Sequence, residues 1–134
     1  MARKRFPPDD PREWLYRARS NLARARTIIP EACLEDLCFD AQQAAEKAIK
    51  AVFIHRGARF PYIHDLDGLL DLLERSGLKI PRYVRESHEL SPFAVVTCYP
   101  GYAGPVKLRR YRRAVRIADA VFRWATRQVE VRSP

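Results

Sequence analysis

One uninterrupted stretch in the middle of the chain most constrains the fold. Residues 35–56 contain neither proline nor glycine, the two residues that most disfavour a helix interior. Their apolar side chains recur at three- and four-residue steps and so share one face of an α-helix; that face comprises Leu37, Ala41, Ala44, Ala45, Ala48 and Val52. Because alanine side chains are small, a neighbouring helix can approach closely. The stretch predicts the central helix of a compact bundle, capped by Gly57.

The segment before it, residues 10–29, predicts a first helix. Asp10 is a suitable N-cap, Pro11 fits the first helical position, and Glu13 completes a capping box. Apolar residues recur along one face, and Pro30 ends the helix.

Two shorter helices are expected next. His64 or Asp65 caps a helix that closes at residues 76–77. Pro81 begins another, and the Ser91-Pro92 step should break or bend it. No pair of strand-like segments exists, so a sheet is not expected.

The sharpest amphipathic pattern belongs to residues 106–129, the predicted final helix. Its expected buried side is Leu108, Tyr111, Ala114, Val115, Ala118, Val121, Phe122, Ala125 and Val129. Its opposite side carries Arg109, Arg112, Arg113, Arg116, Arg123 and Arg127. Guanidinium groups recognise phosphate bidentately, so this arginine stripe is a candidate phosphate or nucleic-acid surface. The alternative is an ordinary solvated helix face.

Length and charge narrow the class of protein. The 134 residues suit one domain over residues 1–134, and the predicted fold is an all-α, up-and-down bundle of four to five helices. A formal charge of +9 favours nucleic acid, nucleotide phosphate, an acidic partner or an anionic surface. No apolar run is long enough for a bilayer span, so we expect a soluble cytoplasmic protein.

Metal and cofactor sites are not expected. The three cysteines lack the paired spacing of a zinc or redox site, and we interpret them as reduced thiols. Acidic residues near His64 reproduce no established ligand spacing, and the sequence has no Gly-rich phosphate loop. His64 is the best candidate for proton transfer, although a capping role explains it as well.

The central helix also has a polar face. Gln43, Glu46, Lys47 and Lys50 follow one another at helical spacing and so lie together. Two lysines beside an amide suit a phosphate, but Glu46 with Lys50 is equally an ordinary ion pair between residues four apart.

These patterns resemble a known family. Residues 40–51, Asp-Ala-Gln-Gln-Ala-Ala-Glu-Lys-Ala-Ile-Lys-Ala, resemble the signature of HEPN domains, which are nucleotide-binding helical bundles of prokaryotes and higher eukaryotes. Residues 64–66 with Leu69 and Leu70 look like the next conserved block, and residues 98–100 look like the family's Arg-Tyr-Pro element. The match extends from Trp14 and Leu15 to the closing residues Tyr111, Ala114, Ala118 and Trp124.

The resemblance implies a bundle that is commonly a homodimer and is often encoded beside a minimal nucleotidyltransferase, with which it forms a complex. Some relatives are toxin-like ribonucleases that use an arginine and a histidine, a few residues apart in a late helix. Arg59 and His64 have such a spacing, but they precede the predicted third helix. Cys98 stands where the Arg-Tyr-Pro element has arginine.

We therefore favour a non-catalytic HEPN subunit that binds a nucleotide or RNA phosphate. Its expected contacts are Gln43, Lys47, Lys50, His64, Arg109 and Arg113, with Tyr99 available to stack on a base. A second hypothesis is a metal-independent ribonuclease toxin using Arg59 and His64. A third is a purely structural dimeric partner subunit.

Overall fold

The computed structural model describes residues 4–63, 65–94 and 105–130, and within these ranges the chain is all-α. Its elements are α1 (Pro11–Arg26), α2 (Leu34–His55), α3 (Leu66–Arg75), α4 (Arg82–Arg85), the 3-10 helix η1 (Glu86–Ala94) and α5 (Leu108–Glu130). The described part contains no strand, and the predicted helical bundle is confirmed.

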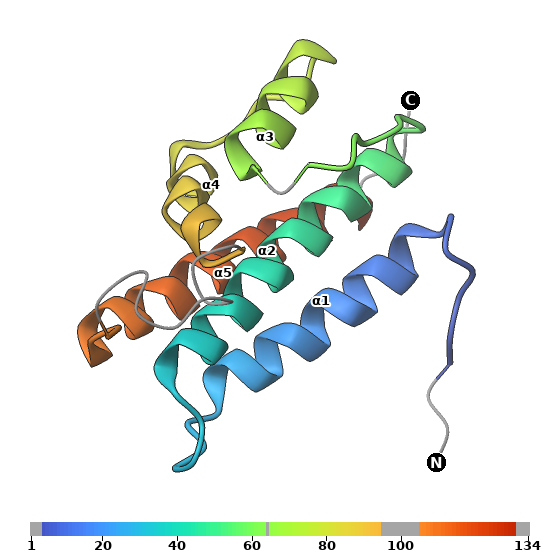
Figure 1. Ribbon diagram of the computed structural model, residues 1–134. Coiled ribbons are helices and arrows are strands. Elements are labelled where there is room, and N and C mark those ends of the chain that lie inside the picture. The colour runs from blue at the N-terminus through green and yellow to red at the C-terminus, as the bar shows by residue number, and fades with distance from the viewer. Residues whose placement is uncertain (1–3, 64, 95–104, 131–134) are drawn as a thin grey trace.

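The three long helices form the body of the bundle. In Figure 1, α1 and α2 run antiparallel side by side, and α5 lies behind α2 and runs in the same direction as α2. The short helices α3 and α4 lie across the other side of α2 and return the chain to the start of α5.

The central position of α2 follows from its alanines, as the sequence predicts. Ala41, Ala44, Ala45 and Ala48 are all completely buried. Buried residues of α1, α3, η1 and α5 join them in one apolar cluster. Small side chains on α2 let α1 and α5 approach from two sides, which fixes these helices against each other.

Helix ends follow most of the predicted signals, but α1 ends at Arg26, with Thr27 as its C-cap, and not at Pro30 as expected. Asp10 caps α1 by accepting a hydrogen bond from the Arg12 backbone amide over 2.9 Å, and Gly57 ends α2 with a φ of +71°. The expected capping box is wrong, because the Asp10 backbone amide donates instead to the Pro7 carbonyl over 3.0 Å. The Glu13 carboxylate faces the chain before the helix, where Arg5 supplies a stronger, charged donor.

The second half of the chain starts its helices as expected. Asp65 caps α3, with its carboxylate accepting from the Asp67 backbone amide over 3.2 Å, whereas His64 lies outside the described residues. Pro81 precedes α4. The helix type changes at Glu86, earlier than the expected break, and Pro92 lies inside η1.

The buried face of α5 is rotated relative to the sequence pattern. Leu108, expected in the core, is 42 % exposed, whereas Ile117 and Trp124 are buried. The reason is packing by η1, whose Leu90 and Phe93 lie beside Ile117. The rotation leaves Leu108 and part of Val115 facing outward near the end of α1.

Candidate functional site

A row of polar side chains lies where α1 meets α2, and we call it the polar seam. Residues that recur every three or four positions share one side of a helix. The seam consists of Glu13, Arg17, Asn21 and Arg24 from α1, with Asp40, Gln43 and Lys47 from α2. Neighbouring positions on the same helices are buried alanines and leucines, so the seam borders the core.

The centre of the seam is a chain of three contacts. Lys47 Nζ donates to Oδ1 of Asn21 over 2.7 Å, and Asn21 Nδ2 donates to Oδ1 of Asp40 over 3.0 Å. Arg24 Nε lies 3.4 Å from the other Asp40 oxygen. Asn21 and Asp40 are buried, so the amide orientation and the position of the Lys47 ammonium are both fixed by the fold.

Lys47 carries its charge in an unfavourable place. Burial lowers the pKa of this half-buried ammonium, and the nearby cations Arg17 and Arg24 lower it further, against the opposing effect of Glu46 and Asp40. Its ammonium donates to the neutral oxygen of Asn21. An anion placed between these cations would favour the charged ammonium and raise its pKa.

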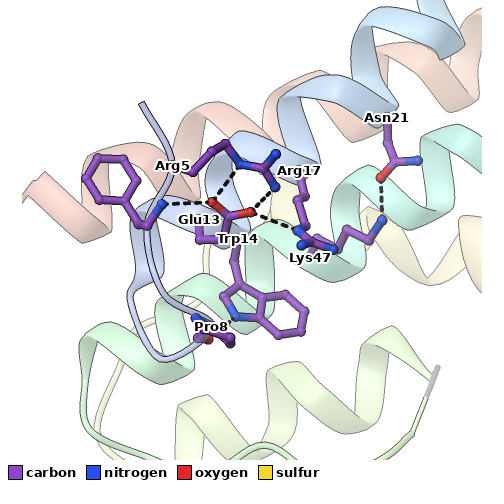
Figure 2. A network of polar contacts seen from close by, with 8 residues as sticks. Arg5, Pro8, Glu13, Trp14, Arg17, Asn21 and Lys47 are labelled. Carbon is purple, nitrogen blue, oxygen red and sulfur yellow. Dashed lines mark hydrogen bonds and ion pairs between the residues drawn. The ribbon is translucent and has the colours of Figure 1, made fainter. Parts of the chain in front are cut away.

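The other end of the seam holds the chain that precedes α1, as Figure 2 shows. The Glu13 carboxylate accepts from Arg5 Nε over 3.1 Å, from the Phe6 backbone amide over 3.1 Å and from Arg17 Nε over 2.9 Å. The hydrogen bonds from Arg5 and then Arg17 lower the pKa of Glu13 to about 2. The indole of Trp14 donates to the Pro8 carbonyl over 2.7 Å, which secures the same segment.

The structure divides the polar residues expected together on the central helix. Lys47 reaches α1, whereas Lys50 is buried and pairs with Glu46, with Nζ 3.0 Å from the carboxylate. The ordinary ion pair considered for Glu46 and Lys50 is therefore confirmed. The Lys50 ammonium also lies 5.1 Å from the centre of the Phe60 ring, and Gln43 donates to Gln42 over 2.7 Å.

The arginines of the α5 stripe are all exposed, as the pattern predicts. Arg113 is already engaged by Glu89, with two nitrogen–oxygen distances of 2.8 and 2.6 Å, and this contact lowers the pKa of Glu89. Arg109 lies elsewhere, at the edge of a surface hollow of about 750 Å³ between the end of α1 and the start of α5. This α1–α5 hollow is lined by Arg26, Ile28, Leu108, Arg109, Tyr111, Arg112, Val115 and Arg116.

The residues of the ribonuclease hypothesis are only partly described. Arg59 is exposed and lines a second hollow of about 590 Å³ with Pro8, Asp9 and Tyr62. His64 and Tyr99 lie outside the described residues. Among the described cysteines, Cys38 is buried, and desolvation raises the pKa of its thiol to about 12. Such a thiol remains protonated and unreactive at neutral pH.

No described group of three or more His, Cys, Asp or Glu side chains is placed to hold a metal ion. Within the same ranges, no helix has the length and apolarity needed to cross a bilayer.

Sequence reasoning missed the α1 half of the seam. Arg17, Asn21 and Arg24 recur at four and three residues, which is the signal that places them on one face. Asp40 was the other signal, because a carboxylate beside an alanine-rich helical face requires a buried partner.

Comparisons with known proteins agree with this fold. The family model described as HEPN domain matches residues 11–129. The chain is similar to the crystal structure of TT1696 from Thermus thermophilus, with 27 % identity, a TM-score of 0.76, and coverage of 88 % of this chain and 97 % of that one. It also shares its fold with ST0689, an archaeal HEPN homologue, with 22 % identity, a TM-score of 0.72, and coverage of 90 % and 98 %. A comparison with curated proteins finds no match. The helices, their order and the family match together identify the chain as a member of the HEPN family.

Proposed function

We propose that this chain is a non-catalytic HEPN subunit that binds the phosphate of a nucleotide or RNA at the polar seam. The observation that carries the proposal is the state of Lys47. Its half-buried ammonium is held by a neutral amide oxygen and lies close enough to Arg17 and Arg24 for these cations to lower its pKa. Glu46 and Asp40 offset only part of this lowering, and a bound phosphate would add negative charge beside the three cations.

The cations differ in how freely they can reach a ligand. The side chains of Arg17 and Arg24 are 60 % and 70 % exposed, and each contacts a seam carboxylate from its own side. Both can therefore turn a guanidinium edge toward a bound phosphate. Lys47, fixed by Asn21, supplies a charge whose position does not change on binding. Gln43 lies one turn before Lys47 and offers a neutral donor.

The proposal changes the expected set of contacts. Gln43 and Lys47 remain from the sequence expectation, and Arg17 with Arg24 are added. Lys50 and Arg113 are engaged by Glu46 and Glu89, and Arg109 lies at the α1–α5 hollow. The proposed contacts thus come from two helices whose packing is set by the core.

We also propose that the protein acts in the cytoplasm as a homodimer that works with a minimal nucleotidyltransferase. Family membership supports this part. Size-exclusion chromatography with light scattering measures the dimer, and a monomer at micromolar concentration contradicts it.

Fluorescence anisotropy with a labelled single-stranded RNA tests the phosphate site. Affinity for RNA decreases as salt concentration rises, and in Lys47→Gln the slope of log affinity against log salt concentration should become shallower by about 1, because one phosphate contact is lost. Lys79→Gln is the matched control, since Lys79 is exposed on the chain between α3 and α4 and the charge change is identical. Equal affinities and slopes for the two variants would contradict the proposal.

The same RNA, analysed on a denaturing gel, separates binding from cleavage. Intact RNA after prolonged incubation agrees with a non-catalytic subunit. Cutting that disappears in Arg59→Ala would instead assign the chain to the ribonucleases.

A further inference from the structure

The α1–α5 hollow differs in chemistry from the polar seam. Two of its lining residues are large aliphatic side chains left in solvent, with Ile28 56 % and Leu108 42 % exposed. Val115 is partly exposed beside them, and Ile29, next to Ile28, is 47 % exposed. A cluster of exposed aliphatic side chains in a hollow is typical of a surface that another molecule covers.

The edge of the hollow is cationic. Arg109, Arg112 and Arg116 follow at three and four residues along α5 and so project on one side of the helix. Among the described residues, none of the three forms an ion pair with a carboxylate. Arg26, across the hollow, pairs with Asp119, which also contacts Arg123 at 3.0 Å. The hollow therefore combines an apolar centre with a largely uncompensated positive edge.

We propose that the α1–α5 hollow docks an acidic amphipathic segment of a different protein. The partner's apolar side chains would contact Ile28, Leu108 and Val115. Its carboxylates would pair with Arg109, Arg112 and Arg116. Residues 108–116 rise about 12 Å along α5, which matches roughly two turns of a partner helix. This inference does not depend on the phosphate site at the polar seam.

Charge and surface chemistry favour this occupant over two others. A second copy of the chain, placed hollow to hollow, would bring like-charged arginine rows together, which is repulsive. Surfaces that bind single-stranded nucleic acid typically combine cations with aromatic rings on which bases stack. The one aromatic residue of the hollow, Tyr111, is only 4 % exposed, and its hydroxyl donates to the Ala25 carbonyl. A peptide that carries both carboxylates and leucines satisfies the apolar centre and the cationic edge together.

Fluorescence anisotropy of the full chain with a labelled twelve-residue peptide, three repeats of Glu-Leu-Leu-Glu, tests this docking. Arg112→Glu combined with Arg116→Glu should weaken binding by about tenfold or more, because two attractive contacts become repulsive. Leu108→Ser should weaken it through the loss of apolar contact. The matched control is Arg19→Glu with Arg75→Glu, two exposed arginines outside the hollow. All the substituted side chains are exposed, and circular dichroism verifies that each variant folds.

Each other result overturns the proposal. If the unmodified protein does not bind the peptide, the hollow is not a docking site for acidic amphipathic segments. If hexaglutamate binds equally well, the apolar centre of the hollow makes no contribution. If the control pair weakens peptide binding equally, the effect comes from the overall charge of the protein and not from the hollow. Loss of a wild-type dimer in the Arg112→Glu, Arg116→Glu variant assigns the hollow to a second copy. RNA that displaces the peptide and loses affinity in the same variant assigns it to nucleic acid.

Discussion

Lys47 on α2 donates a hydrogen bond to Asn21 on α1 over 2.7 Å, which is one of the contacts that join the two halves of the polar seam. Asn21 presents its oxygen to Lys47 because Asp40 accepts from its amide nitrogen over 3.0 Å. A neutral side chain thus separates a carboxylate from an ammonium within one buried chain of contacts. Asp40 therefore fixes the orientation of Asn21 and contacts Lys47 only through this amide.

Lys47 should make stability increase with pH in the alkaline range. Its folded pKa lies below the ordinary value of 10.5, mainly because of burial, so the unfolded chain binds more protons between the two values. The charged ammonium therefore lowers stability near neutral pH, and this effect is relieved as pH rises through the folded pKa. Urea unfolding of the unmodified protein and Lys47→Met between pH 7 and pH 10 measures it. The unfolding free energy of the unmodified protein should rise relative to that of Lys47→Met as the pH increases. A difference that stays constant over this range contradicts the prediction.

Glu13 should contribute stability that is lost in acid. Arg5, Arg17 and the Phe6 amide depress its pKa from the ordinary 4.5 to about 2. A carboxylate with a depressed folded pKa stabilises the fold fully above its unfolded pKa and progressively less as pH falls through the folded value. Melting temperatures of the unmodified protein and Glu13→Gln should thus converge between pH 4.5 and pH 2. The variant keeps the side-chain shape, so an equal gap across this range would indicate lost packing instead.

The buried pair of Lys50 and Glu46 should be sensitive to the loss of one partner. Lys50→Met leaves the Glu46 carboxylate, only 5 % exposed, without its ammonium. The expected loss is about 3 kcal/mol of unfolding free energy. Adding Glu46→Gln removes the buried carboxylate as well and should recover a large part of the loss. A double variant as unstable as Lys50→Met alone contradicts this account.

The alanine face of α2 should not accept larger side chains. Ala44 is completely buried, and a leucine there should lower the unfolding free energy by about 1–3 kcal/mol through overpacking. Ala23→Leu makes the same chemical change at an exposed position of α1 and should alter stability little. Urea unfolding compares the two, and equal effects would mean that the helices are not closely packed.

Local signals in the sequence predict the helices well. The Pro- and Gly-free alanine stretch specifies α2, Asp10 with Pro11 specifies the start of α1, and Gly57 specifies the end of α2. These features depend on backbone conformation and on the hydrophobic face of a single helix, which sequence spacing alone determines.

The candidate sites depend on how helices are rotated against each other, which spacing alone does not determine. Lys47 and Lys50 lie on neighbouring parts of α2, yet one reaches Asn21 and the other is enclosed with Glu46. Leu108 continues the apolar pattern of α5 but faces outward, because η1 packs beside Ile117. Residues three apart, such as Lys47 and Lys50, differ by about 60° around the helix axis, so a modest rotation of a helix decides which of them faces the core.

The segment before α1 competes with Arg17 for the Glu13 carboxylate. The same carboxylate holds Arg5 and Arg17. If Arg5 detaches, Arg17 becomes the sole remaining guanidinium for this acid and is drawn further from any incoming phosphate. If phosphate binds at the polar seam as proposed, a firmly attached leading segment should strengthen its binding through Arg17, and a fusion partner placed there should alter the affinity without contacting Lys47.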